Sequence, residues 1–219
     1  LRGLYAAPVG LWGPLAALMV EKGITGPDTW LEGSKGLYNV YFDGLYNRDV
    51  VLTNLGKSFE TAKIGYKPWP SCALTHSYVD ASLRIVKEND IKPEDIAGVT
   101  ASVGDSTNQL FEPLEMRRKP PTIMDAKWSL PFTIACAIAK RQVVLANFTP
   151  VGIKSEEILG VAQKVSPEYD PTLKEAHGSF PAQVSIRTRS GQVHECRVNH
   201  PYGHPGNPMS KEDLVLKFR

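Results

Sequence analysis

The chain turns at Lys67-Pro68-Trp69-Pro70-Ser71-Cys72-Ala73-Leu74-Thr75-His76, where a proline-rich segment enters a helix on which the rest of the fold depends. Pro68 and Pro70 disfavour helix before Ser71, because proline lacks an amide hydrogen and restricts the preceding residue. Ser71 is a suitable N-cap, since its hydroxyl accepts hydrogen bonds from free amides of the first turn. We therefore expect a helix over residues 71–89.

One face of this helix combines apolar and reactive side chains. Helical spacing places on that face Cys72, His76, Val79, Leu83 and Val86. Cys72 and His76 would point inward one turn apart, at the end nearest Lys67. A helix start, an ammonium group and an imidazole suit an anion such as a carboxylate. Spacing alone leaves open a second interpretation, in which His76 is a hydrogen-bonded core residue.

Length and composition are those of an ordinary globular protein. The 219 residues are enough for one large or two small domains, with 42% hydrophobic and 22% charged residues. The net charge is +2, and no basic block with interleaved aromatic residues occurs, so we expect no nucleic-acid partner. The apolar run 11–20 contains glycine and proline and is too short to span a bilayer, so we expect no membrane partner.

Cysteine usage indicates a reducing compartment. The three cysteines, Cys72, Cys136 and Cys196, are widely spaced and odd in number, which argues against a disulfide framework. We therefore expect a cytoplasmic protein. No pair of cysteines has zinc-finger spacing, so we predict no bound metal.

Hydrophobic patterns divide the chain into helices and strands of an α+β fold. A small antiparallel sheet is expected, because two alternating segments flank a glycine turn at 189–191. Expected helices cover 11–22, part of 36–51, 71–89, 126–140 and 155–165. Expected strands cover 97–103, 184–188 and 192–198, and a proline-bounded loop covers 107–121.

Four segments, in order along the chain, resemble the MmgE/PrpD family. The first is Gly23-Ile24-Thr25-Gly26-Pro27 followed by Leu31-Glu32-Gly33, and the second is Lys67 with Pro70-Ser71-Cys72-Ala73-Leu74-Thr75-His76. The third is Asp125-Ala126-Lys127-Trp128-Ser129-Leu130-Pro131-Phe132. The fourth is Gly203-His204-Pro205-Gly206-Asn207-Pro208-Met209-Ser210, followed by Leu214 and Lys217-Phe218-Arg219. The resemblance extends over nearly the whole chain.

The resemblance implies an α+β lid over a helical domain, with the active site between them. It assigns 1–63 to part of the helical domain, 64–202 to the lid and 203–219 to a segment that returns to the helical domain. Family members are about twice this long, so the chain resembles an internal fragment, a split subunit or a processed product. They are usually homodimers, so a homodimer or a complementary helical subunit is the expected partner.

The family's reactions move a proton next to a carboxylate, or release carbon dioxide from that position. The resemblance implies a cofactor-independent lyase, a dehydratase of a small polycarboxylate such as 2-methylcitrate, to which this chain supplies part of the active site. An epimerase or racemase of a small dicarboxylate is an alternative reaction. A non-catalytic lid subunit is an alternative from another functional class.

The expected catalytic residues are Lys67, His76 and Cys72. Lys67 would neutralise a carboxylate, and His76 would move a proton, because the ordinary pKa of imidazole lies near ~6.5. Cys72 stands where decarboxylase-like relatives have a histidine, and a thiol is a different acid, so the resemblance favours dehydration over decarboxylation of cis-aconitate. A fourth hypothesis makes Cys72 a nucleophile and His76 its base. We discount it, because the sequence shows no recognisable oxyanion loop.

Three further residues are candidates for substrate binding. By ungapped alignment, Arg2 and Tyr5 occupy positions where relatives have a lysine and often a histidine. Arg2 still suits a carboxylate but does not act as a base, because guanidinium stays protonated. Ser129, near the start of the second apolar helix, is the third candidate if it faces the cleft.

Overall fold

The computed structural model describes residues 6–175 and 178–218, and the chain divides into two compact units, Leu1–Phe59 and Glu60–Arg219. The division lies close to the boundary expected between residues 63 and 64. The assignment of 64–202 to a lid and of 203–219 to a return segment stays a prediction. Each unit is described below by itself.

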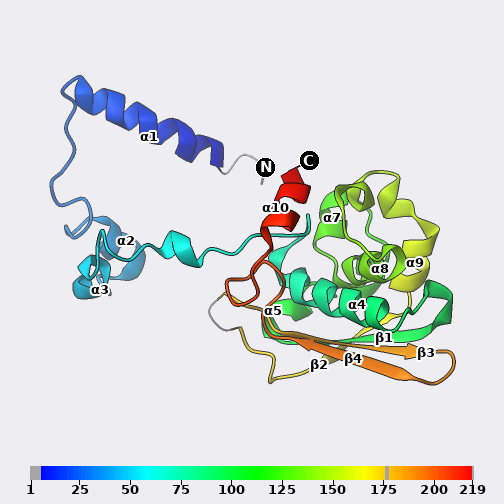
Figure 1. Ribbon diagram of the computed structural model, residues 1–219. Coiled ribbons are helices and arrows are strands. Elements are labelled where there is room, and N and C mark those ends of the chain that lie inside the picture. Colours follow the sequence, from blue (N-terminus) through cyan, green and yellow to red (C-terminus); the bar gives the residue numbers. More distant parts are fainter. Residues whose placement is uncertain (1–5, 176–177, 219) are drawn as a thin grey trace. The chain divides into compact units, whose positions relative to one another are not determined.

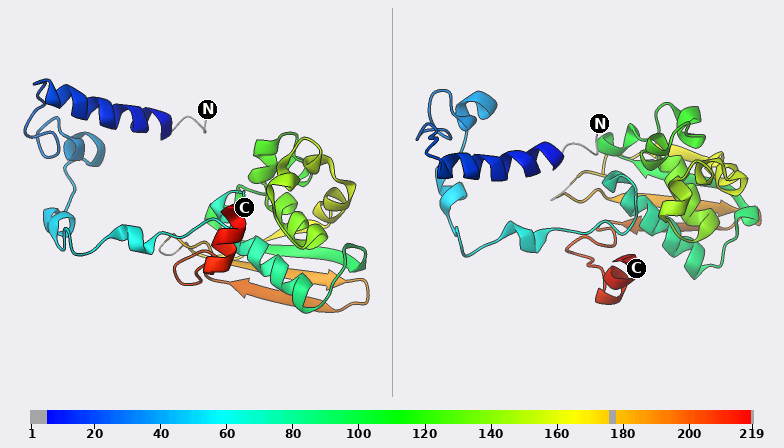
Figure 2. Two further views of the ribbon diagram at one scale, coloured as in Figure 1. Left: turned by 45° about the horizontal axis from the view of Figure 1, so that its top comes forward. Right: turned by 90° about the horizontal axis from the view of Figure 1, so that it is seen from above.

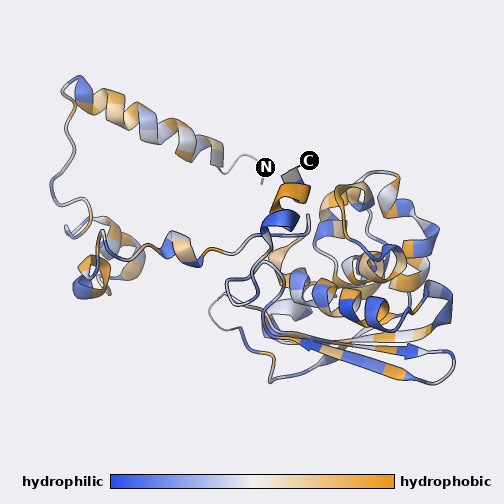
Figure 3. Cartoon of the chain, viewed as in Figure 1, coloured by the Kyte–Doolittle hydropathy of each residue, from blue (hydrophilic) through white to orange (hydrophobic). Residues whose placement is uncertain are grey.

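The first unit is helical and carries much exposed apolar surface. Its helices are α1 (Ala6–Glu21), α2 (Leu37–Phe42) and α3 (Arg48–Leu52). As expected, α1 ends just before Gly23, which has a positive φ of 88°. The Tyr38 and Tyr46 rings stack with centroids 4.0 Å apart. Apolar residues are spread along α1 (Figure 3), and its Trp12 is 61% exposed.

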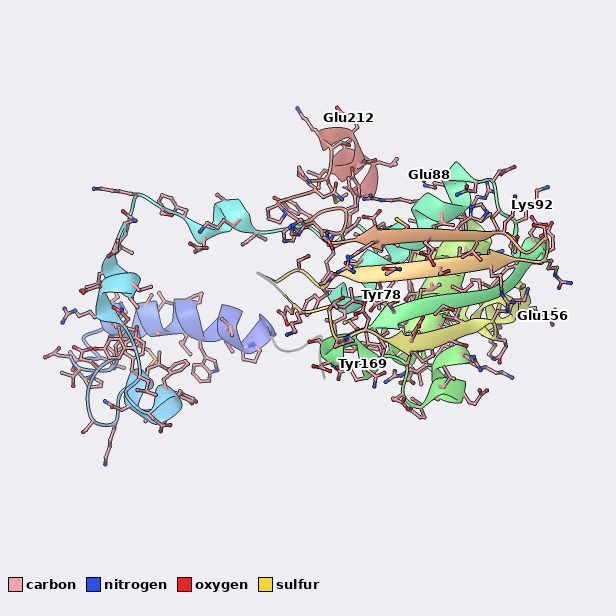
Figure 4. All side chains as sticks on the ribbon, turned by 90° about the horizontal axis from the view of Figure 1, so that it is seen from below. Tyr78, Glu88, Lys92, Glu156, Tyr169 and Glu212 are labelled. Atoms are coloured by element: carbon pink, nitrogen blue, oxygen red, sulfur yellow. The ribbon has the colours of Figure 1, made fainter. Side chains whose placement is uncertain are left out.

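The second unit is built on a four-stranded sheet in the order β2-β1-β3-β4 (Figure 4). The strands are β1 (Ile96–Val103), β2 (Val165–Tyr169), β3 (Ala182–Thr188) and β4 (Val193–Val198). The β3–β4 hairpin confirms the expected one, with Gly191 at a φ of 89° in its turn. The sheet is mixed where a wholly antiparallel one was expected, because β2 pairs with β1 in parallel. β2 escaped prediction because only Val165 in it is buried, so no alternation is visible.

Helices cover one face of this sheet (Figures 1 and 2). Helix α4 (His76–Glu88) packs on β3 and β4 and also on α8 (Leu130–Lys140), which in turn contacts α9 (Glu156–Ala162). Shorter helices are α5 (Asp105–Asn108), α6 (Leu114–Arg118), α7 (Ile123–Lys127) and α10 (Lys211–Phe218). The prediction of a loop over 107–121 is therefore wrong in part, since this segment contains the end of α5 and all of α6.

The hydrophobic core lies between the sheet and these helices. On β3 the buried residues alternate, with Ala182, Val184 and Ile186 fully buried. Tyr78 and Phe132 are among the largest fully buried side chains and come from α4 and α8. An alternating strand face buried under amphipathic helices is an α+β architecture, which confirms the predicted fold class.

Two helix starts differ from the expectation, for local reasons. Ser71 is not the N-cap: a 3-10 turn over Ala73–Thr75 precedes α4, and the Ser71 hydroxyl hydrogen-bonds Thr75 Oγ1 at 2.8 Å. The expected helix 126–140 is split, since α7 ends at Lys127 and Ser129 caps α8 by accepting the Phe132 amide. Within the described ranges, none of the helices combines the length and hydrophobicity that a bilayer-spanning segment requires.

Candidate active site

His76 is the first residue of α4 and lies in the wall of a pocket. It is only 4% exposed, and its Nε2 atom is buried without a hydrogen-bond partner. The edge of the Trp69 ring packs against the imidazole, with centroids 5.3 Å apart. Buried polar atoms are nearly always satisfied in folded proteins, so this unpartnered ring nitrogen is an unusual feature of the residue.

The pKa of His76 is lowered from 6.5 to about 4. Burial is the largest cause, because it disfavours the charged imidazolium, and the positive charge of Lys67 is the second. Lys217 adds a smaller effect of the same sign, while backbone hydrogen bonds with Ser71 and Trp69 act in the opposite direction. His76 is therefore neutral at pH 7 and able to accept a proton.

The pocket has a volume of about 310 Å³ and lies within the second unit. Three parts of the chain form it: the extended segment before α4, the start of α4, and the loop 201–205, with Gly178 and Phe180 completing the wall. Four of the described residues that line the pocket carry a basic group, namely Lys63, Lys67, His76 and His204. None of the described lining residues carries a carboxylate. Such a lining favours an anionic ligand.

Lys67 and His76, the two residues singled out from the sequence, line this same pocket. Their proximity shows in the effect of the Lys67 charge on the His76 pKa. Helix α10 reaches the same place, because the Lys217 ammonium donates a hydrogen bond to the Lys67 carbonyl oxygen. Two cations therefore act on one neutral imidazole.

The loop over the pocket needs glycine where it meets the extended segment. The Tyr66 amide donates to the Gly203 carbonyl oxygen at 2.8 Å, and Gly203 has a φ of 91°. A Cβ on Gly203 would lie 2.1 Å from the Tyr66 carbonyl oxygen, and one on Gly65 would lie 2.7 Å from the Gly203 carbonyl oxygen. The two backbone segments approach so closely that there is no room for a side chain at residue 65 or residue 203.

His204 is held in a fixed orientation at the pocket. Its ring stacks on that of His200 with centroids 4.5 Å apart and planes 11° from parallel. The Gly206 amide donates to His204 Nδ1 at 3.0 Å, so this nitrogen is an acceptor. The turn therefore fixes the tautomer of a second histidine in the wall.

Cys72 and Ser129, two other predicted site residues, are not among the described residues that line the pocket. Cys72 is partly buried before α4, but it is not among the lining residues, and its amide donates to the Lys127 carbonyl oxygen at 2.9 Å. Ser129 is fully buried, and its hydroxyl donates to the Arg117 carbonyl oxygen while capping α8. Arg2 and Tyr5 lie outside the described residues.

The sequence analysis missed two lysines that act at this site. Lys63 lines the pocket and pairs with the exposed Glu60 at 2.8 Å, and no motif distinguishes it from any surface lysine. Lys217 belongs to the terminal segment that carried the resemblance, which was a usable signal. In the part of the chain that the structure describes, no three His, Cys, Asp or Glu side chains are gathered as around a metal ion.

Most of this chain matches a known protein family. Residues 69–219 match the model of the MmgE/PrpD C-terminal domain. The cis-aconitate decarboxylase of Mus musculus is 23% identical in an alignment of 164 positions, and the match covers 71% of this chain and 32% of that protein. The cis-aconitate decarboxylase of Homo sapiens is 22% identical over 160 residues, with the same shares. The chain thus spans about a third of the length of the curated relatives it matches.

Proposed function

This chain belongs to the MmgE/PrpD family, and from that premise we propose that it supplies part of the active site of a cofactor-independent lyase. The reaction is the dehydration of a small polycarboxylate such as 2-methylcitrate. Family members include dehydratases and decarboxylases that act on carboxylic acids, which supports the substrate class. We further propose that the protein works in the cytoplasm, as a homodimer or with a complementary helical subunit.

One observation carries this proposal: a buried histidine with a lowered pKa lines the same pocket as Lys67, and none of the described lining residues has a carboxylate. Lys67 provides a fixed positive charge for a substrate carboxylate. His76 provides a lone pair for the proton on the neighbouring carbon. A core histidine without function would be expected to have both ring nitrogens hydrogen-bonded.

The chemistry follows from these two groups. His76 removes the proton from the carbon next to a carboxylate, the electron pair of that C–H bond forms the new C=C bond, and the C–O bond to the hydroxyl group breaks. The proton taken up by His76 then passes to the departing hydroxide, which gives water and returns His76 to the neutral form. Negative charge builds on the carboxylate during this step, and the Lys67 ammonium stabilises it. A bound carboxylate also raises the pKa of His76, because it offsets the charges of Lys67 and Lys217.

Incubation of the 219-residue chain with 2-methylcitrate in deuterated water tests the proposal. Exchange of the proton next to a carboxylate, followed by NMR, is the most sensitive readout, because it requires only the first chemical step. We expect slow exchange together with slow formation of the alkene product, since this chain supplies only part of the active site. His76→Gln should abolish both, because glutamine offers no basic nitrogen.

The same experiment separates the alternatives. Exchange with inversion of configuration and without alkene indicates an epimerase. Binding of 2-methylcitrate without any exchange indicates a non-catalytic lid subunit. Exchange that persists in His76→Gln contradicts the assigned role of His76, and absence of both binding and exchange overturns the proposed function.

A further inference from the structure

A buried carboxylate lies one helical turn beyond His76, and neither the sequence analysis nor the proposed function uses it. Asp80 is 6% exposed and follows His76 on the same face of α4, because residues four apart are neighbours on a helix. Arg84 binds it with two hydrogen bonds, from Nε at 2.8 Å and from Nη2 at 3.0 Å. This pairing fixes the orientation of the carboxylate.

The remaining hydrogen bond of Asp80 connects α4 with the pocket loop. Asp80 Oδ2 accepts the amide of Tyr202 at 2.9 Å. Tyr202 lines the pocket and immediately precedes Gly203, whose carbonyl oxygen holds the Tyr66 amide beside Lys67. Asp80 is therefore joined, through one backbone segment, to the part of the chain that carries the pocket lysine.

Tyr202 extends the same connection to α10. Its hydroxyl donates to Asp213 Oδ2 and accepts the Ser210 amide at 3.0 Å. From α10, Lys217 reaches back to the Lys67 carbonyl oxygen. The contacts thus form a closed path from the helix that carries His76, through Tyr202, to the segment that carries Lys67.

We propose that Asp80 is a positioning residue, which holds the loop 201–205 over His76 and thereby sets the geometry between the imidazole and Lys67. The proposal rests on the proposed function only for the identity of the ligand. Because Asp80 is not among the residues that line the pocket, it acts through Tyr202. Release of this hydrogen bond frees the loop and admits water to the buried Nε2.

The titration of His76 by NMR, without ligand, tests the proposal directly on the 219-residue chain. In Asp80→Ala we expect the pKa of His76 to rise from about 4 towards 6.5 as the ring gains water. Loss of the Asp80 charge by itself would lower the pKa of His76, because a negative charge favours the imidazolium. A rise in this pKa is therefore attributable only to opening of the loop. Asp80→Asn retains one acceptor for Tyr202 and should shift the pKa less.

A second readout is the affinity for 2-methylcitrate. We expect this affinity to fall about tenfold in Asp80→Ala, because the hydrogen bond between the Tyr202 amide and the Asp80 carboxylate no longer holds the loop, and one charge-assisted hydrogen bond has about this strength. The matched control is Asp90→Asn, which removes the exposed ion pair with Arg141 and should change neither quantity. If the unaltered chain binds no 2-methylcitrate, the proposed function fails, but the titration still tests Asp80.

Two results would overturn the positioning role. One is a folded Asp80→Ala protein in which His76 titrates as in the unaltered chain. The other applies if Asp80→Ala does not fold: Asp80→Asn, folded, with both the His76 titration and the affinity unchanged. A loss of thermal stability alone, with both readouts unchanged, would show that Asp80 serves only the fold.

Discussion

At the scale of single residues, the chain sets a neutral imidazole against fixed positive charge. Burial of His76 and the nearby charge of Lys67 both favour the uncharged ring. The cost is an unsatisfied Nε2, which lowers the stability of the folded state, since a buried polar atom without a partner costs about 1–3 kcal/mol. Active sites commonly retain such locally unfavourable features.

The lowered pKa of His76 predicts a pH dependence of folding stability. The imidazole binds a proton near pH 6.5 in the unfolded chain but only near pH 4 in the folded one, so between these values the unfolded state holds more protons. The contribution is fully present above pH 6.5 and is lost as the pH falls to 4. Its size is about 3 kcal/mol.

Urea unfolding of the unaltered chain and of His76→Gln, at several pH values, measures this contribution. We expect the difference in unfolding free energy between the two proteins to grow as the pH rises from 4 to 6.5 and then to level off. A difference that is independent of pH would show that His76 does not titrate abnormally.

The sequence predicted His76 and Lys67 at one site but not the roles of Cys72 and Ser129. His76 and Lys67 lie at the two ends of the proline-rich segment 67–76, so local chain geometry alone brings them together. Cys72 was expected on the inner face of a continuous helix, but the 3-10 turn over Ala73–Thr75 changes the angular spacing before α4. Helical spacing cannot be extended across such a turn.

At the scale of elements, helix caps and the loop 201–205 with its Gly203 determine which residues line the pocket. The sequence predicted β1, the β3–β4 hairpin and most helices, because their hydrophobic periodicity is local. It missed β2, the short helices α5 and α6, and the break between α7 and α8. β2 is defined by its pairing with a distant strand, and the break by the Ser129 cap, which tertiary contacts with Arg117 support.

Gly203→Ala tests the close approach of the pocket loop to the segment before α4. The added Cβ would meet the Tyr66 carbonyl oxygen at 2.1 Å, so we expect a destabilisation about 2 kcal/mol larger than the conformational penalty alone. Gly191→Ala measures that penalty, because its φ of 89° is similar and nothing lies within 4 Å of the added Cβ.

Thermal or urea unfolding of the two alanine variants gives the comparison. Equal losses of stability at residues 203 and 191 would mean that the loop moves away freely and does not constrain the pocket. A larger loss at Gly203, with weaker binding of 2-methylcitrate, is the expected result.

Ser129→Ala separates a capping role from a substrate-binding role. Ser129 accepts the Phe132 amide and is fully buried, so its loss should cost about 1–2 kcal/mol of stability without changing ligand affinity. Ser155→Ala is the matched control, because Ser155 precedes α9 without a side-chain capping bond and should change stability by less than about 0.5 kcal/mol. Weakened binding in folded Ser129→Ala would restore the substrate role.

At the scale of the whole chain, the buried hydrophobic core belongs to one unit. The core residues that the structure describes all lie between Tyr78 and Val198, whereas large apolar side chains such as Leu11, Trp12 and Val20 are more than 60% exposed in the first unit. The site also lies within the second unit. Hydrophobic periodicity does not reveal which helices lack a buried face, so the boundary expected between residues 63 and 64 came from the resemblance alone and stays a prediction.

We therefore predict that residues 60–219, expressed alone, fold cooperatively with a Tm within a few degrees of that of the 219-residue chain. The reason is that the core and its hydrogen bonds are contained in this segment. Calorimetry of both chains measures the effect. A segment 60–219 that lacks a cooperative transition would show that the first unit contributes to the core.

The proposed site binds an anion between Lys67 and His76, and isothermal titration with 2-methylcitrate measures that binding. We predict that Lys67→Met weakens the affinity of the chain by at least about tenfold, since one charge-assisted hydrogen bond is lost. Lys87→Met, which removes an exposed lysine of α4 away from the pocket, should leave the affinity unchanged. Equal affinities for the unaltered chain and both variants would contradict the central claim.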